Sequence, residues 1–140
     1  MEIIEKIKSN PISKFLYWTA RIGMGLAFIA SGIRKLPGVK FTILPLEDPV
    51  GFYFAAMHST GFYWNFIGYF QILIGILIFF RRFVVFSSLS MMPVTINIFL
   101  VSVCLGMRGT PFITLMMLIG NALLLIWHFN NYRTLFKKPL

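Results

Sequence analysis

Four long apolar stretches constrain this chain more than any other feature of its sequence. They cover, in order, residues 15–33, 62–80, 83–107 and 110–129. A helix needs about 20 apolar residues to cross the hydrocarbon core of a bilayer, so each stretch is long enough to be a membrane span. We therefore predict an all-α protein, a transmembrane four-helix bundle in which residues 1–140 form a single integral membrane domain.

The composition agrees with this prediction. Of all residues, 58% are hydrophobic and only 12% are charged, whereas a soluble domain carries about 25% charged residues. The formal net charge of +9 could indicate nucleic-acid binding. However, the basic residues stand singly or in pairs between the apolar stretches, which is a pattern of membrane topology. We expect the lipid bilayer as a partner of this chain and no nucleic acid.

The basic residues also predict the orientation of the bundle. Four spans place both termini on one side, which carries eight basic residues: Lys6, Lys8, Lys14, Arg81, Arg82, Arg133, Lys137 and Lys138. The other side carries four: Arg34, Lys35, Lys40 and Arg108. Because the cytoplasmic side of a membrane protein is the more basic one, we expect both termini in the cytoplasm. The expected location is a bacterial cytoplasmic membrane.

One long connection, residues 34–61, joins the first two spans. Connections of this length without structure of their own are uncommon. Asp48 followed by Pro49 is typical of a helix start, with Asp as the N-cap and Pro in the first turn. The sequence predicts a short loop helix over 50–58 that lies in the membrane interface or re-enters the bundle mouth. Its aromatic residues are expected to contact the spans: Phe52, Tyr53 and Phe54.

Each span carries one stripe of polar or small residues. Residues seven apart return to nearly the same face of a helix, and the stripes are Arg21, Phe28 and Lys35, with Gly25 and Gly32 between them; Gly68, Gln71 and Gly75; Ser90, Asn97 and Cys104; Thr114, Asn121 and His128. Such stripes are typical of the inward faces of a bundle. In the first span Gly23, Ala27 and Ser31 also recur every four residues, and we expect this face to allow close approach of another backbone.

Several polar residues in or beside the spans are candidates for a ligand site: Arg21, Gln71, Asn97, Asn121 and His58. Two interpretations stay open for the amides. They join helices through hydrogen bonds worth about 0.6–2 kcal/mol, or they contact a quinone or lipid bound between the long loop and the bundle. The large aromatic residues in 52–64 would suit a flat ring, although aromatic residues also gather at membrane interfaces without a ligand.

Arg21 is the hardest of these candidates to place. It lies roughly 10 Å along a helix from Lys14, at a depth where a cation tends to face a bundle interior or a polar cavity. Beyond Asp48 the chain has no Asp or Glu, so no span supplies a carboxylate partner. Three alternatives are open: the side chain reaches lipid headgroups, is held by neutral amides and carbonyls, or binds an anionic or carbonyl-bearing ligand. We expect it inside the bundle at the height of Asn121, below Gln71.

The chain offers few groups for catalysis. Cys104 is the single cysteine, and His58 and His128 are isolated in the sequence, so no metal site is expected. No nucleophile–base pair or phosphate-binding loop can be assembled from these residues. We do not expect an autonomous enzyme, and quinone is the candidate ligand rather than an established cofactor.

Three segments carry a resemblance to a known family. RIGMGLAFIASGIRKLPG, GYFQILIGILIFFRRF and SSLSMMPVTINIFL together resemble the DoxX-like family of small four-span membrane proteins, over about residues 15–130. The resemblance implies a four-helix bundle with a loop helix between the first two spans. It also implies a link to quinone-linked and other redox complexes. Many DoxX-like proteins carry a Glu where this chain has Gln71, and this chain therefore lacks the acid that would pair with Arg21.

Three functions compete at this point. The resemblance favours a non-catalytic subunit or assembly partner of a quinone-linked membrane redox complex, with other subunits or further copies of itself as partners. The polar candidates favour a membrane protein that binds a quinone or lipid, with Arg21, Gln71 and Asn97 as contacts. A small transporter is disfavoured, because the chain has no internal repeat and no acid within a span.

Overall fold

The structure, a computed structural model, describes residues 2–133, so Lys137 and Lys138 lie outside the described residues. Within this range the chain is helical, with turns and loops between the helices: α1 (Glu2–Ser9), α2 (Pro11–Ile33), α3 (Pro49–Ser59), α4 (Phe62–Leu77), α5 (Val84–Cys104), α6 (Thr110–Trp127) and α7 (Phe129–Tyr132). The predicted all-α bundle with a loop helix between the first two spans is confirmed.

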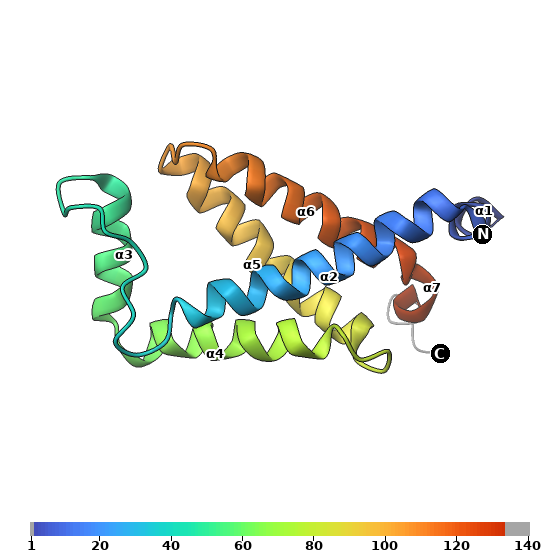
Figure 1. The fold of residues 1–140 in the computed structure, drawn as a ribbon, viewed down its shortest axis with the longest axis horizontal. Coiled ribbons are helices and arrows are strands. Elements are labelled where there is room, and N and C mark those ends of the chain that lie inside the picture. The colour runs from blue at the N-terminus through green and yellow to red at the C-terminus, as the bar shows by residue number, and fades with distance from the viewer. Residues whose placement is uncertain (1, 134–140) are drawn as a thin grey trace, which may run out of the picture.

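The four long helices α2, α4, α5 and α6 form the bundle. Helix α2 runs beside α4, and α5 runs beside α6 (Figure 1). Helices α1 and α7 lie at one end of the bundle, which we call the terminal end, and α3 lies at the opposite end, which we call the loop end (Figure 1). The four long helices therefore carry the chain back and forth between the terminal end and the loop end.

Three helices, α2, α5 and α6, are each long and apolar enough to cross a membrane. Helix α4 has 16 residues, or about 24 Å of helix, which is shorter than the roughly 30 Å hydrocarbon core. Helices α3 and α4 together are apolar enough to count as one span, but they are bent by 95° at Thr60 and Gly61. Helix α3 therefore turns sharply away from α4 and lies across the loop end of the bundle.

Glycines hold α2 and α4 close together. A Cβ atom added at Gly32 would lie 2.6 Å from the carbonyl oxygen of Gly68, and one added at Gly75 would lie 2.9 Å from that of Gly25. These glycines belong to the predicted inward stripes. The close approach expected at Gly23 is wrong, since that residue is exposed and a Cβ there would meet nothing within 4 Å. The seven-residue spacing located the contact face, whereas of the four-residue stripe Ser31 reaches Gln71 of α4 and Gly23 does not face that helix.

Candidate functional site

The start of α3 follows the sequence prediction closely. Asp48 is its N-cap, and its Oδ1 accepts hydrogen bonds from the backbone N–H groups of Val50 at 2.8 Å and Gly51 at 3.4 Å. Pro49 occupies the first turn, where its missing N–H costs nothing. Gly51 fits against the preceding loop, because a Cβ there would collide with the carbonyl oxygen of Pro45. The loop and α3 therefore pack as one unit.

An aromatic cluster joins this unit to the bundle. Phe54 of α3 stacks on Phe41 of the loop, with ring centroids 4.1 Å apart. It also lies 6.0 Å from the ring of Trp64, in the first turn of α4. The expected contact between the loop helix and a span is thus confirmed for Phe54, whereas Phe52 is largely exposed.

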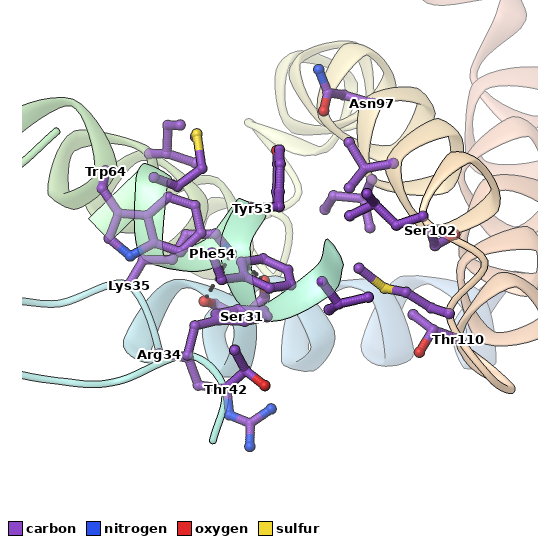
Figure 2. A pocket seen from close by; sticks show the side chains of 18 of the residues that line it. Ser31, Arg34, Lys35, Thr42, Tyr53, Phe54, Trp64, Asn97, Ser102 and Thr110 are labelled. Carbon is purple, nitrogen blue, oxygen red and sulfur yellow. Dashed lines mark hydrogen bonds between the residues drawn. The ribbon is translucent and has the colours of Figure 1, made fainter. Parts of the chain in front are cut away.

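A large cavity lies at the loop end, among α3, α4 and α5. Its volume is about 1150 Å³, and α2, the 34–48 loop and the start of α6 complete its walls. Figure 2 shows Lys35 and Ser31 of the α2 end on one side, and Asn97 and Ser102 of α5 on the other. Most of the lining is apolar and aromatic, which is typical of small-molecule sites. We call it the loop-end cavity.

Lys35 is the buried cation of this cavity, which the exposed Arg34 and Arg108 and the carboxylate of Asp48 also line. The side chain is only 6% exposed, and its Nζ donates hydrogen bonds to Oγ of Ser31 at 2.7 Å and to the Ser31 carbonyl at 3.2 Å. The same nitrogen lies 4.9 Å from the Phe41 ring centroid and 5.2 Å from that of Trp64. Burial, with a smaller contribution from the charge of Arg34, lowers the pKa of Lys35 to about 8.

A hydrogen-bond chain leads from Lys35 to Gln71. Lys35 Nζ donates to Ser31 Oγ, and Ser31 Oγ donates to Oε1 of Gln71 at 3.4 Å. This chain fixes the orientation of the amide, since a hydroxyl that accepts from an ammonium has its own proton to donate. The amide nitrogen of Gln71, Nε2, therefore points away from Ser31.

Two buried donors of this cavity have no acceptor among the described residues. They are Nε2 of Gln71 and Nε1 of Trp64, on residues that are 0% and 2% exposed. Leaving a buried donor unpaired costs about 1–3 kcal/mol. Both residues line the loop-end cavity together with Lys35. The walls of the cavity thus contain the buried Lys35 ammonium and two unpaired N–H donors, together with the Asp48 carboxylate and the guanidinium groups of Arg34 and Arg108. A ligand with hydrogen-bond acceptors fits the two donors, and it reaches them when the side chains that cover them move.

The structure brings two of the five predicted site residues to this cavity. Gln71 and Asn97 both line it, although Asn97 is exposed while Gln71 is fully buried. His58 is exposed in the last turn of α3 and does not line the cavity. Arg21 and Asn121 lie elsewhere in the bundle.

Arg21 is held by backbone carbonyls at the terminal end. Its Nε donates to the carbonyl oxygen of Ile78 at 2.7 Å, and Nη2 donates to that of Phe79 at 3.0 Å. These carbonyls follow the last turn of α4, where the helix dipole favours a cation. The side chain is only 3% exposed. Of the three alternatives for this charge, the structure shows the one in which neutral carbonyls hold it.

Asn121 is fully buried and faces the proline of α5. With both ends of the amide satisfied, Nδ2 donates to the Ser88 carbonyl at 3.0 Å, and Oδ1 accepts from Met92 N at 3.0 Å and Thr95 Oγ1 at 3.2 Å. Ser88 and Met92 are the pair that would bond to each other in an unbroken helix, one residue before Pro93. Asn121 therefore joins α6 to the turn of α5 that precedes Pro93.

Lys35 and Trp64 carry polar groups of the cavity that the sequence does not predict as site residues. The charge pattern places Lys35 in the basic flank of the first span, although it also belongs to the stripe of Arg21 and Phe28. Trp64 belonged to the aromatic segment that suited a flat ring, but nothing in the sequence showed that its N–H would be buried without an acceptor. The burial of both side chains depends on how the loop that carries Phe41 packs against them.

Comparison with known proteins gives one result for the family. The sequence profile of the DoxX family matches residues 16–103, which run from the start of the apolar part of α2 to the end of α5. The chain belongs to the DoxX family. No curated protein sequence and no solved structure matches it significantly. The part that matches the DoxX family contains Lys35, Trp64, Gln71 and Asn97, and hence the polar groups of the loop-end cavity. With its apolar helices, the chain is an integral membrane protein of this family.

Proposed function

We propose that this protein is a non-catalytic membrane subunit that binds a quinone in the loop-end cavity for a membrane redox complex. One observation carries the proposal: two buried N–H donors without acceptors, on Trp64 and Gln71, line the same cavity as the Lys35 ammonium. A ligand that accepts hydrogen bonds at this place would remove the cost of leaving them unpaired.

A quinone suits both the donors and the walls. Its flat ring carries carbonyl oxygens that accept hydrogen bonds from neutral and charged donors, and the ring can stack on aromatic side chains such as Tyr53 and Phe54. Its apolar tail can lie along the α4 and α5 walls, where Phe66, Phe70 and Ile98 line the cavity. The resemblance to the DoxX-like family adds the expectation of a quinone-linked partner complex.

A binding experiment with matched tryptophan variants tests the ligand. Titration of the purified protein with a short-chain quinone should give saturable binding, and Trp64→Phe should weaken it about tenfold, because it removes one buried hydrogen bond and keeps an aromatic ring. Gln71→Leu should have a similar effect. Trp18→Phe is the control, since Trp18 lies at the terminal end and does not line this cavity. Equal affinity in the Trp64 and Trp18 variants would reject the assignment.

A second experiment tests the partner complex. The protein should be extracted with a mild detergent from its native membrane, and the proteins that co-purify should be identified by mass spectrometry. We expect subunits that carry redox cofactors. Recovery of the chain alone or only with further copies of itself, after extraction that preserves other respiratory complexes, would contradict the role as a subunit without affecting the ligand assignment.

A further inference from the structure

The terminal end of the bundle holds a second, smaller cavity, which the proposed function does not use. Its volume is about 280 Å³, and we call it the terminal-end cavity. Residues from α2, from the connection after α4, from the start of α5 and from the end of α6 line it: Tyr17, Trp18, Arg21, Arg81, Val84 and His128. Two of these side chains are guanidinium groups, and no described residue that lines the cavity is acidic.

The charge of Arg21 is not neutralised by its partners. Its two hydrogen bonds go to the carbonyls of Ile78 and Phe79, and they use two of the five N–H groups of a guanidinium. The guanidinium carbon also lies 4.9 Å from the ring centroid of Trp18. Carbonyls and aromatic faces stabilise a cation but leave the net positive charge in place. A buried cation of this kind gains most from an anion, because its desolvation is otherwise repaid only in part.

Tyr17 and His128 add a neutral donor beside this charge. The Tyr17 hydroxyl and His128 Nε2 are 2.8 Å apart, and the Tyr17 ring stacks on Trp127 with centroids 4.6 Å apart. Whichever tautomer the imidazole adopts, one proton of the pair is not used between them: the hydroxyl proton in one case, Nδ1–H in the other. The pair can thus donate one hydrogen bond to a ligand.

We propose that the terminal-end cavity binds an anionic phosphate group, supplied by the headgroup of a phospholipid. Arg21 and Arg81 provide the charge, and phosphate is the anion that a pair of guanidinium groups recognises best. A lipid is the favoured source because Trp18, which lines the cavity, has a half-exposed ring on a helix apolar enough to cross a membrane, and Phe83, which precedes Val84 of the cavity in the chain, is also exposed. Acyl chains can cover these rings while the phosphate occupies the cavity.

Arg81 and Arg82 make a matched pair for the test. Both are exposed and adjacent in the sequence, but only Arg81 lines the cavity. The lipid-depleted protein should be titrated with phosphatidylglycerol and with phosphatidylcholine, and binding should be followed by native mass spectrometry. We expect phosphatidylglycerol to bind more tightly, and Arg81→Gln to weaken it about tenfold. The Arg82→Gln control should weaken it less than about twofold.

Two further measurements keep the proposal falsifiable. Tyr17→Phe keeps the ring that stacks on Trp127 and removes the hydroxyl, and we expect it to weaken phosphatidylglycerol binding severalfold without loss of the folded bundle. Titration with inorganic phosphate distinguishes the two sources of the anion: saturable binding that depends on Arg81 would keep the anion site and reject the lipid. Equal losses in the Arg81 and Arg82 variants, or none in either, would overturn the site itself.

Discussion

Two buried cations, Arg21 of α2 and Lys35 in the turn just after α2, have different surroundings, although the same seven-residue spacing links them. Arg21 is 3% exposed and Lys35 is 6% exposed. Arg21 has two backbone carbonyls after the last turn of α4 as acceptors. Lys35 has the hydroxyl and carbonyl of Ser31, two aromatic rings, and a large cavity with unpaired donors beside it.

Arg21 joins α2 to the end of α4 through carbonyls of the protein itself, whereas Lys35 lies beside a cavity whose walls contain unpaired donors. The carbonyls around Arg21 belong to a helix terminus that needs donors in any state of the protein. Lys35 has its own acceptors on Ser31, but two donors in the same walls, on Gln71 and Trp64, have none among the described residues. The loop-end cavity therefore keeps unpaired donors when it is empty, whereas the carbonyls of Ile78 and Phe79 have Arg21 as their donor.

The largest expected effect is the loss of Arg21. Arg21→Met keeps the apolar length of the side chain but leaves the Ile78 and Phe79 carbonyls without their donors. We expect the bundle to lose roughly 3–5 kcal/mol of stability, since each hydrogen bond to a charged group contributes about 1.5–3 kcal/mol. Thermal unfolding in detergent measures this loss. Lys35→Met should have a much smaller effect on stability, and equal destabilisation by both variants would remove the distinction between the two cations.

The next effect concerns the glycine contacts that hold α2 close to α4. Gly32→Ala should destabilise the bundle by about 1–3 kcal/mol, the usual cost of overpacking, because the added Cβ would lie 2.6 Å from the Gly68 carbonyl oxygen. Gly23→Ala is the matched control on the same helix. Its Cβ meets nothing within 4 Å, so its stability should equal that of the wild type or exceed it slightly. If the Gly23 variant were destabilised instead, the face of α2 that contacts α4 would not be the one that carries Gly32.

A smaller effect is expected from pH, and only at the loop end. The pKa of Lys35 is lowered from 10.5 to about 8 by burial and by Arg34. Between these values the unfolded chain binds more protons than the folded one, so the stability of the empty protein should rise with pH from about 8 to about 10.5. Quinone affinity should fall over the same rise in pH, because the ammonium loses its charge.

The control for this prediction is Lys35→Met, which should bind quinone more weakly at pH 7 and lose the dependence above pH 8. Calorimetric or fluorescence titrations from pH 7 to pH 9.5 would show both. Binding whose affinity stays constant across this range in the wild type would mean that the Lys35 ammonium does not contact the ligand.

The sequence predicted the features that depend on local chemistry. The start of the loop helix followed from Asp48 and Pro49, because an N-cap and a first-turn proline act within a few residues of each other. The inward faces of α2 and α4 followed from the stripes that contain Gly25, Gly32, Gly68 and Gly75, although the sequence did not say that these two helices would meet, and Gly23 of the four-residue stripe is exposed.

The partners of the charged and polar groups could not be predicted in the same way. Arg21 is held by the carbonyls of residues 78 and 79, and backbone carbonyls have no signature in a sequence. Asn121 bridges the turn before Pro93, which depends on the relative height of α5 and α6. The sequence predicted Gln71 as a contact of a flat ligand, but it could not show that the N–H groups of Gln71 and Trp64 are buried without acceptors, which depends on how the loop and α3 pack on α4.

The most direct test of the loop-end site is the position at which a quinone attaches. A photoreactive short-chain quinone should be bound to the protein in detergent, irradiated, and its attachment points mapped by mass spectrometry of peptides. We predict labelling of the cavity walls around Tyr53, Met57 and Trp64, prevented by excess unlabelled quinone and strongly reduced in the Trp64→Phe and Gln71→Leu variants. Labelling spread over the lipid-facing helices, or centred on Arg21 at the terminal end, would contradict the assignment of the loop-end cavity.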